Sequence, residues 1–302
     1  MRSTNTIIAL AVAIILAIIS YVLLAFVGLS GERGDGAPIT GGFYLQESAT
    51  PVMDDLVTVY NLVTYIIAGI VAFVLGLMAF IMIRFREKAN PVPSKTSHNT
   101  LIEVIWTVAP VLILLVMAIP SMNLLYKQDV IKDTEVTVKA VGDTWNWIYS
   151  YPDHENVDEI TSVVLEKTEA DTLKLPYLLA TDAALVVPVN TNVKVLVTAN
   201  TNMHAWTVPS FGIKMDAVPG LVNETWFRAT REGTFYGQCS EICGIDHFKM
   251  PIEVQVVSQD AYKAWVANDG VFPQQYSQYI INKTVGEQAQ NIMGSGQTAA
   301  QK

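Results

Sequence analysis

Two long apolar stretches constrain this chain more than any other feature, because each is long enough to cross a lipid bilayer. They cover residues 56–85 and 101–125, and a helix needs about 20 apolar residues to span the hydrocarbon core. The loop between them, residues 84–95 with a few polar residues after it, holds four basic residues and one acidic residue. This excess of positive charge predicts a cytoplasmic loop. Residues 56–125 are therefore expected to form a transmembrane helical hairpin whose outer ends face the periplasm.

The second stretch contains features that a simple anchor does not need. Pro110 and Pro120 lie inside it, and neighbouring helices satisfy the backbone groups that proline frees in a membrane. Membrane-embedded partners are therefore expected. Glu103 lies at the cytoplasmic mouth of the same stretch. A carboxylate at a membrane boundary often only extends towards water, so the residues alone leave its role open.

A third apolar run, residues 7–29, comes after Arg2. It is longer than a usual signal-peptide core, but it has a single positive charge before it and small residues after it that could fit a processing site. Two interpretations of residues 1–30 stay open, a cleaved signal peptide and a retained membrane anchor. Either one would export the segment that comes directly after it. Residues 31–55 are polar and Gly-rich and are predicted to form a periplasmic surface lead-in.

From residue 134 the pattern changes to short β-rich runs. The chain is 51% hydrophobic with a mean hydropathy of +0.33, too apolar for an ordinary soluble protein, while its second half is too charged for a membrane domain. Several runs alternate apolar and polar residues, which predicts a sheet with one buried face. Such strands over about 130 residues fit a Greek-key sandwich or barrel. The predicted strands are residues 134–140, 184–188, 193–198, 225–228, 234–236 and 252–257.

Other parts of the exported half are assigned by composition. Residues 166–182 are polar and are predicted to be a surface insertion, and residues 259–268 are predicted to form a short helix with Tyr262, Trp265 and Val266 on its inner side. Residues 142–151 hold four aromatic side chains, of which Trp147 and Tyr149 are expected in the core. The exported domain is placed at residues 126–270, and the Gln-, Ser- and Gly-rich tail at 271–302 is expected to be partly disordered.

The stretch 237–250 holds the only two cysteines of the chain together with an imidazole and a thioether. These are soft or borderline ligands of the kind that bind copper. Two thiolates four residues apart on one tight loop can face a common centre, and each sulfur could bridge two metal ions. A second imidazole is needed on the other side, and His204 is the histidine in a matching context. The candidates in the stretch are Cys239, Cys243, His247 and Met250.

Three simpler interpretations compete with a dinuclear centre. Two cysteines in an exported domain most often form a disulfide, but a disulfide explains neither His247 nor Met250. Zinc takes Cys, His and carboxylate ligands, so a zinc site leaves Met250 unused. A mononuclear blue-copper site needs one cysteine, so the second is surplus to it.

On these residues the chain resembles subunit II of the haem-copper cytochrome c oxidases, which carries the dinuclear copper centre CuA. The resemblance runs from about Gly42 to about Ala267. It implies a cupredoxin-like domain, so the expected fold is an α+β membrane protein, a transmembrane helical hairpin followed by a cupredoxin-like Greek-key β-barrel. The copper ligands that it implies are His204, Cys239, Cys243, His247, Met250 and the backbone carbonyl of Glu241.

The resemblance also implies roles for three other side chains. The carboxylate of Glu241 matches the family's ligand for a magnesium ion shared with subunit I, as expected of a hard cation. Glu103 matches a glutamate at the entrance of a proton path into subunit I. Trp145 matches the tryptophan at which electrons from cytochrome c enter. The chain departs from the family pattern at three positions near these sites, which are Asn146, Thr201 and Leu221.

The function implied is that of the electron-entry subunit of a proton-pumping terminal oxidase in the bacterial inner membrane. It would accept electrons from reduced cytochrome c at CuA and pass them to the haem of subunit I, where oxygen is reduced to water. Subunit I, subunit III and the lipid bilayer are the expected partners, and no nucleic acid is expected. A quinol-oxidase subunit would lack the cysteines, nitrous-oxide reductase needs a long propeller domain, and a copper-delivery protein would not need Glu103 or Trp145.

Charge suggests how a donor could dock. Residues 126–270 contain 20 acidic and 11 basic side chains, a formal charge of −9. An acidic face beside Trp145 would steer a basic partner such as cytochrome c, although such a face can also be no more than solvated surface. The docking candidates are Asp143, Asp153, Glu155, Asp158 and Glu159.

Overall fold

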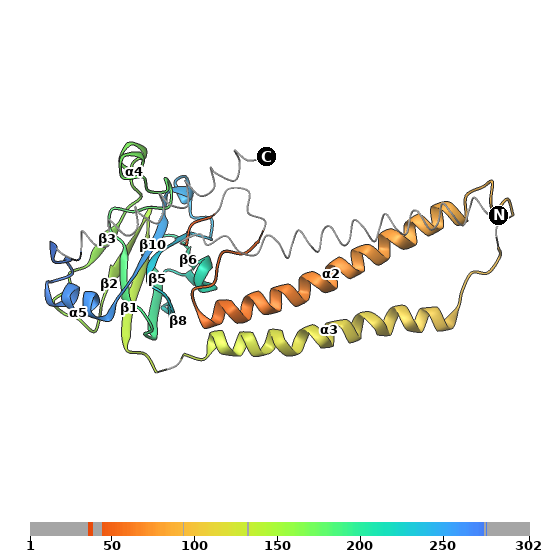
Figure 1. Cartoon of the computed structure of the whole chain (residues 1–302), viewed down its shortest axis with the longest axis horizontal. Coiled ribbons are helices and arrows are strands. Elements are labelled where there is room, and N and C mark those ends of the chain that lie inside the picture. Colours follow the sequence, from red (N-terminus) through yellow and green to blue (C-terminus); the bar gives the residue numbers. More distant parts are fainter. Residues whose placement is uncertain (1–35, 39–43, 93, 132, 275, 277–302) are drawn as a thin grey trace, which may run out of the picture. The chain divides into compact units, whose positions relative to one another are not determined.

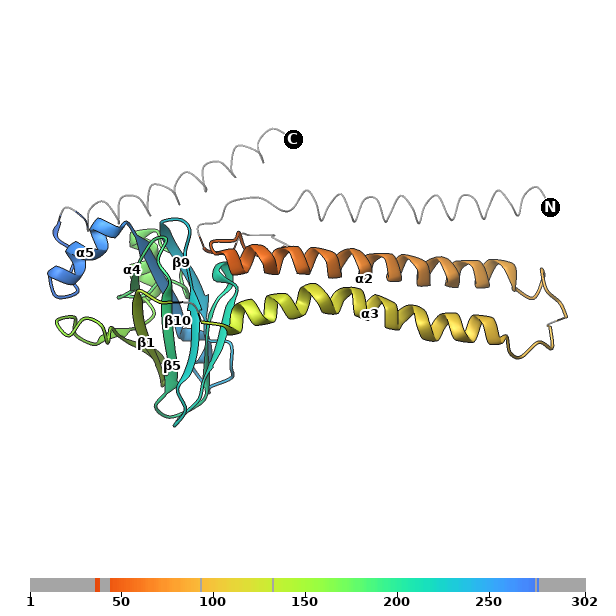
Figure 2. The same ribbon diagram turned by 90° about the horizontal axis from the view of Figure 1, so that it is seen from below.

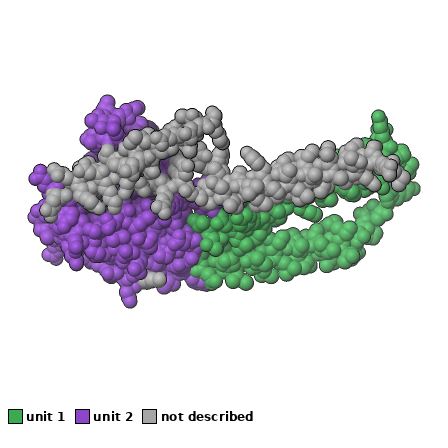
Figure 3. Space-filling view, in the orientation of Figure 1, with its two compact units in different colours: residues 1–31, 56–125 green, residues 32–55, 126–302 purple. Residues whose placement is uncertain are grey.

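The computed structural model describes residues 36–38, 44–92, 94–131, 133–274 and 276, which fall into two compact units (Figure 1 and Figure 3). The helical unit contains residues 56–125, and the β unit contains the described residues of 36–55 and those from 126 onwards. Residues 1–30, predicted to be a signal peptide or an anchor, lie outside the described residues, as does most of the tail 271–302.

Two long helices, α2 (Pro51–Arg84) and α3 (Thr100–Asp129), run side by side in opposite directions (Figure 1 and Figure 2). Both are long and apolar enough to cross a membrane, and most of their side chains are exposed along the hairpin. An apolar surface all round is typical of helices that pack against lipid or other membrane helices. The predicted hairpin is thus present in the helical unit.

Both helices are longer than predicted, because the apolar pattern marks only the part suited to a membrane. The helix α2 begins at Pro51, and the hydroxyl of Thr50 accepts a hydrogen bond from the backbone nitrogen of Met53 at 3.1 Å. Threonine before a proline is a common helix start, since the hydroxyl caps a free N–H and proline fits the first helical position. At its other end α3 continues to Asp129.

Three sheets make up the β unit. The largest has five strands in the order β3-β2-β1-β5-β8, the second has the order β4-β10-β9, and β6 pairs with β7. The pairs β1–β5 and β4–β10 are parallel, whereas the other paired strands are antiparallel. The strands are β1 (Val136–Asp143), β2 (Asn146–Ser150), β3 (Ile160–Ser162), β4 (Leu185–Pro188), β5 (Val193–Ala199), β6 (His204–Val208), β7 (Ile213–Ala217), β8 (Asn223–Phe227), β9 (Gly233–Gln238) and β10 (Pro251–Val257).

The core of the β unit follows the alternation in its strands. Every second residue of β5 is buried, as expected of a strand with one face on the core. Large aromatic rings fill the space, and Phe211 stacks on Phe227 with ring centroids 4.7 Å apart. Trp147 and Tyr149 are fully buried, which confirms their predicted place in the core.

The sequence prediction missed several short elements. The runs that form β3 and β7 were not assigned as strands, and their lengths of three and five residues give too little alternation to detect. The predicted surface insertion contains a helix, α4 (Lys167–Leu173), whose Ala170 is buried with Leu165 and Tyr236. The helix predicted at 259–268 is confirmed as α5 (Gln259–Ala267), with Tyr262 and Trp265 buried.

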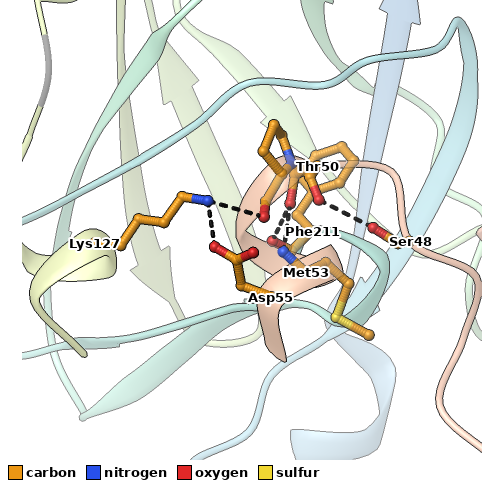
Figure 4. A network of polar contacts seen from close by, with 7 residues as sticks. Ser48, Thr50, Met53, Asp55, Lys127 and Phe211 are labelled. Atoms are coloured by element: carbon orange, nitrogen blue, oxygen red, sulfur yellow. Dashed lines mark hydrogen bonds and ion pairs between the residues drawn. The ribbon is translucent and has the colours of Figure 1, made fainter. Parts of the chain in front are cut away.

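The first turn of α2 and the last turn of α3 belong to the β unit, where a polar network holds them (Figure 4). Lys127 forms an ion pair with Asp55 and donates a hydrogen bond to the carbonyl of Pro51 at 3.3 Å. The Thr50 hydroxyl donates to the carbonyl of Phe211 at 2.8 Å. Phe211 ends the short 3-10 helix η1 (Pro209–Phe211), which comes directly after β6.

Candidate metal centre

The predicted ligands come from two places in the β unit and meet in its interior. His204 is the first residue of β6 and is fully buried. The others lie in the connection from β9 to β10, which we call the ligand loop (residues 239–250), with a 3-10 turn η2 (His247–Lys249) near its end. Cys239, Cys243 and Met250 are all buried.

One group of donor atoms gathers around the two sulfurs. The Sγ atoms of Cys239 and Cys243 are 3.9 Å apart. The Nδ1 atom of His204 lies 3.1 Å from the Sδ atom of Met250 and 3.8 Å from the Sγ atom of Cys239. The Sδ atom of Met250 is also 3.4 Å from the Sγ atom of Cys243. The imidazole of His204 therefore contacts the thiol of Cys239, and the thioether of Met250 contacts both that imidazole and the thiol of Cys243.

A second group contacts the same thiols. The Nδ1 atom of His247 lies 3.4 Å from the Sγ atom of Cys243. The carbonyl oxygen of Glu241 lies 3.3 Å from the Sγ atom of Cys239. The two sulfurs are thus shared by one set containing His204 and Met250 and another containing His247 and the Glu241 carbonyl.

This donor set fits two copper ions better than the simpler alternatives. Both cysteines are free thiols, and their 3.9 Å separation is far from the ~2.05 Å of a disulfide. Metal–thiolate bonds are about 2.3 Å long, so sulfurs less than about 4.6 Å apart can share an ion. The ligand atoms of His204, Cys239 and Cys243 lie within 4.8 Å of one another, a group that does not include His247, so a single ion in that group would leave the imidazole of His247 unused. The thioether and thiolates favour copper over zinc.

The centre is buried enough to change the acidity of its ligands. Burial raises the pKa of the Cys243 thiol to about 12, with the neighbouring Cys239 as a further cause. Burial also lowers the pKa of His204, against the opposing effect of the Asp143 carboxylate. Without a metal ion the thiol of Cys243 is therefore protonated at neutral pH, and metal binding must displace its proton.

Close packing fixes the ring of His204. It lies edge-on to Trp147, with ring centroids 6.0 Å apart. On another side it touches Gly142, where an added Cβ atom would lie 2.7 Å from the ring carbon Cδ2. A side chain larger than hydrogen at Gly142 would therefore displace the imidazole.

Trp145 lies beside the ligand loop, where its indole nitrogen donates a hydrogen bond to the carbonyl oxygen of Cys243 at 3.2 Å. The side chain is half-buried. Sequence reasoning missed a second donor to the same oxygen, the amide of Asn202 at 3.1 Å. In the sequence, the position of Asn202 two residues before His204 was the one feature that could have pointed to this role.

The docking candidates divide into two groups. Asp143 lies at the end of β1 next to Trp145, where it accepts a hydrogen bond from Asn200 at 2.9 Å. Asp153 instead accepts one at 2.6 Å from the backbone nitrogen of Thr137, near the start of β1. Six residues of strand, about 20 Å, separate these two ends. The remaining candidates, Glu155, Asp158 and Glu159, are exposed in the segment after Asp153.

Glu103 belongs to the helical unit and not to the metal centre. It lies in the first turn of α3 and accepts a hydrogen bond from the backbone nitrogen of Asn99 at 3.1 Å.

Comparisons with known proteins agree with this geometry. Residues 136–257 match the family described as cytochrome c oxidase subunit II, periplasmic domain, and residues 38–124 match the transmembrane domain of the same subunit. The chain is 44% identical over 251 residues to a probable cytochrome c oxidase subunit 2 from Rickettsia felis, covering 82% of this chain and 78% of the relative.

Two further similarities concern bacterial proteins. The chain is 44% identical over 246 residues to cytochrome c oxidase subunit 2 from Cereibacter sphaeroides, covering 76% of this chain and 81% of the relative. The crystal structure of the periplasmic domain of subunit II of cytochrome oxidase from Bradyrhizobium japonicum is 44% identical and covers 46% of this chain and 96% of that chain, with a TM-score of 0.43.

The fold and the donor set define a class, the membrane-anchored copper proteins in which a periplasmic cupredoxin-like domain follows two transmembrane helices. Within it, the chain belongs to the cytochrome c oxidase subunit II family. It is therefore a subunit of a haem-copper oxidase complex with subunit I as its partner. The family binds CuA, and the group formed by His204, Cys239 and Cys243 fits that copper site.

Proposed function

We propose that this chain is the electron-entry subunit of its oxidase, taking electrons from reduced cytochrome c and delivering them to the haem of subunit I. The observation that carries the proposal is the pair of donor sets on two shared sulfurs, His204 with Met250 on one side and His247 with the Glu241 carbonyl on the other. A delivery protein that must release its copper would not need six donors in a buried site.

When bound, the dinuclear copper centre supplies an acceptor for one electron at a time. The protein contributes a site with little freedom to move. The backbone nitrogen of Cys239 donates to the carbonyl of Met250 at 3.3 Å, which closes the base of the ligand loop. Burial of Cys239, Cys243 and His204 excludes water from the sulfurs. Ligands held in this way move little when the charge of the site changes, which favours rapid electron transfer.

Trp145 connects the surface to this site. Its half-buried ring can meet a docked donor, and its indole nitrogen contacts the backbone of Cys243. We assign it the entry of electrons. Cytochrome c is the proposed donor, because the acidic exported domain suits a basic partner.

Glu241 is proposed to serve two metals. Its carbonyl oxygen faces the Cys239 thiol, which leaves the partly exposed carboxylate for a hard cation. Magnesium shared with subunit I is the cation proposed. Subunit III is proposed as a further partner in the membrane.

Counting copper in the purified oxidase tests the proposal. The wild-type chain should carry two coppers and give the electron-spin signal of an unpaired electron shared between them. Cys239→Ser should abolish that signal, because one of the two shared sulfurs is lost, whereas the neighbouring Ser240→Ala should leave it intact. A wild-type chain with one copper and a free thiol would contradict the proposal, as would a disulfide between Cys239 and Cys243 in the copper-loaded protein.

A further inference from the structure

The carbonyl oxygen of Cys243 accepts hydrogen bonds from two side chains that are remote in the sequence. The indole nitrogen of Trp145 lies 3.2 Å away and the amide nitrogen of Asn202 lies 3.1 Å away. We propose that Asn202 is a positioning residue of the metal centre, whose amide holds the ligand loop against the segment that precedes His204. This inference rests on the proposed function, because it concerns the geometry of the copper-loaded loop.

Asn202 completes a ring of contacts among three segments, which are the turn at residues 143–146, the segment 200–203 and the ligand loop. Asn200 joins the segment to the turn, because its amide donates to the Asp143 carboxylate and its backbone nitrogen to the Gly142 carbonyl, both at 2.9 Å. Trp145 joins the turn to the ligand loop. The bond from Asn202 to Cys243 links the ligand loop back to the segment. Removing that one bond opens the ring.

Apart from the buried side chain of Cys243, the middle of the ligand loop is weakly packed. Ile242 and Ile245, on either side of Cys243, are 84% and 85% exposed, so packing of these two side chains contributes little. The backbone bonds of Cys239 to Met250 and of Ser240 to Ala205 fix only the base of the loop. The carbonyl of Cys243 therefore depends on the two side-chain donors for its position.

The position of Cys243 matters because its sulfur belongs to both donor sets. It lies 3.4 Å from the sulfur of Met250 and 3.4 Å from the Nδ1 atom of His247. His204 directly follows the segment that carries Asn202, two residues away. The Asn202 amide, together with the bond from Ser240 to Ala205 at the base of the loop, thus helps to set the distance between His204 and the ligands on the loop.

Two substitutions of Asn202 distinguish the effect of losing its hydrogen bond from the effect of misfolding. Asn202→Asp keeps the size of the side chain but replaces the donor with an acceptor that repels the Cys243 carbonyl. Asn202→Ala removes the donor without repulsion, and covers the case in which the aspartate variant fails to fold. Asn192→Asp is the matched control, since the amide of Asn192 makes a similar bond to the carbonyl of Asp133 at 2.9 Å elsewhere in the β unit.

The test uses the assembled oxidase containing the full-length chain. The copper hyperfine splitting of the electron-spin signal is recorded for each variant. The rate at which a copper(I) chelator removes copper from the reduced protein is then measured. We expect Asn202→Asp and Asn202→Ala to change the splitting and to lose copper roughly 2- to 10-fold faster, as the loss of one hydrogen bond predicts. Asn192→Asp should match the wild type in both measurements.

The outcomes separate this inference from the proposed function. If the wild-type chain holds two coppers and both Asn202 variants keep its splitting and its release rate, Asn202 is not a positioning residue and the inference fails alone. If the wild-type chain does not hold two coppers, the proposed function fails and this inference fails with it. A variant that assembles with fewer than two coppers, while Asn192→Asp retains both, supports the inference.

Discussion

The carboxylate of Glu103 accepts a hydrogen bond from the backbone nitrogen of Asn99, and the side chain of Asn99 in turn accepts one from the backbone nitrogen of Ile102, at 3.1 and 3.2 Å. This reciprocal pair caps the first turn of α3 in the manner of a capping box. Glu103 therefore has a structural role beside the proton-path entrance proposed for it.

Two substitutions distinguish these roles of Glu103. Glu103→Gln keeps an oxygen that can cap the helix but cannot carry a proton, so it should slow oxygen-consuming turnover while leaving the rate of copper reduction by cytochrome c unchanged. Glu103→Ala removes the cap as well. If the glutamine variant turns over at the wild-type rate and only the alanine variant is impaired, Glu103 is a capping residue and not part of a proton path.

Trp145→Phe should slow electron transfer inside the bound complex with cytochrome c and leave the affinity for the donor nearly unchanged. Phenylalanine keeps an aromatic ring but lacks the nitrogen that contacts the Cys243 carbonyl. Flash-induced electron transfer within the preformed complex measures the step directly. A variant that transfers electrons at full speed would leave Trp145 as a structural aromatic residue.

Because Asp143 lies apart from the other acidic docking candidates, the two groups should affect the salt dependence of the association rate with cytochrome c differently. Screening lengths fall from about 30 Å at 0.01 M salt to about 10 Å at 0.1 M, so the association rate with cytochrome c should drop steeply over this range. Joint neutralisation of Asp153, Glu155 and Asp158 should flatten that dependence. Asp143→Asn should lower the rate even at 0.1 M, because Asp143 adjoins Trp145. Stopped-flow rates across the salt range test this, and a rate independent of salt would indicate a mainly apolar contact.

Glu241→Gln should remove magnesium without removing copper. The backbone carbonyl that faces Cys239 remains in the variant, whereas an amide is a poorer ligand than a carboxylate for a hard cation. Metal analysis of the purified complex should therefore find two coppers per chain and a loss of one magnesium. Unchanged magnesium would place that ion elsewhere, and loss of copper would show that the side chain also supports the copper site.

Glu253 predicts a pH dependence of stability in the β unit. Its carboxylate accepts a hydrogen bond from the backbone nitrogen of Thr181 at 2.7 Å, but burial raises its pKa from the ordinary 4.5 to about 7. Between these values the folded state binds more protons than the unfolded state, so this group's contribution to stability is present below about pH 4.5 and is lost as pH rises through 7.

Replacing Glu253 isolates that contribution. Relative to the wild type, Glu253→Gln should gain stability as pH rises from 4.5 to above 7, by at most about 3 kcal/mol. Denaturant unfolding followed by tryptophan fluorescence at several pH values provides the comparison. A difference between the two proteins that does not change with pH would mean that the carboxyl group titrates normally.

The membrane spans could be predicted, and the candidate metal ligands proposed, from the sequence because their signals are local. A run of apolar residues needs no knowledge of the fold, and the residues of the ligand loop lie within twelve positions of each other. His204 lies 35 residues before Cys239 and was found by the chemistry of its type and context. The extra turns of α2 and α3 were missed because those turns belong to the β unit and carry no membrane pattern.

Features that depend on chain reversal could not be predicted from the sequence. Asp143 and Asp153 are ten residues apart in the sequence, which suggested one acidic cluster. The antiparallel pairing of β1 with β2 carries the chain back, however, and places Asp153 beside Thr137. The role of Asn202 was invisible for the same reason, since its partner Cys243 is 41 residues further on.

The parallel pairing of β4 with β10 sets the order in which the molecule can be built. Leu185 of β4 lies opposite Val254 of β10 in this pairing. Because β10 begins directly after Met250, it must leave the ribosome and cross the membrane before the two strands can pair. Pairing between strands that are distant along the chain is slow, because closing a long loop costs entropy. Copper insertion at the ligand loop would therefore come after translocation, and both thiols would have to be reduced on the oxidising side of the membrane when the metal arrives.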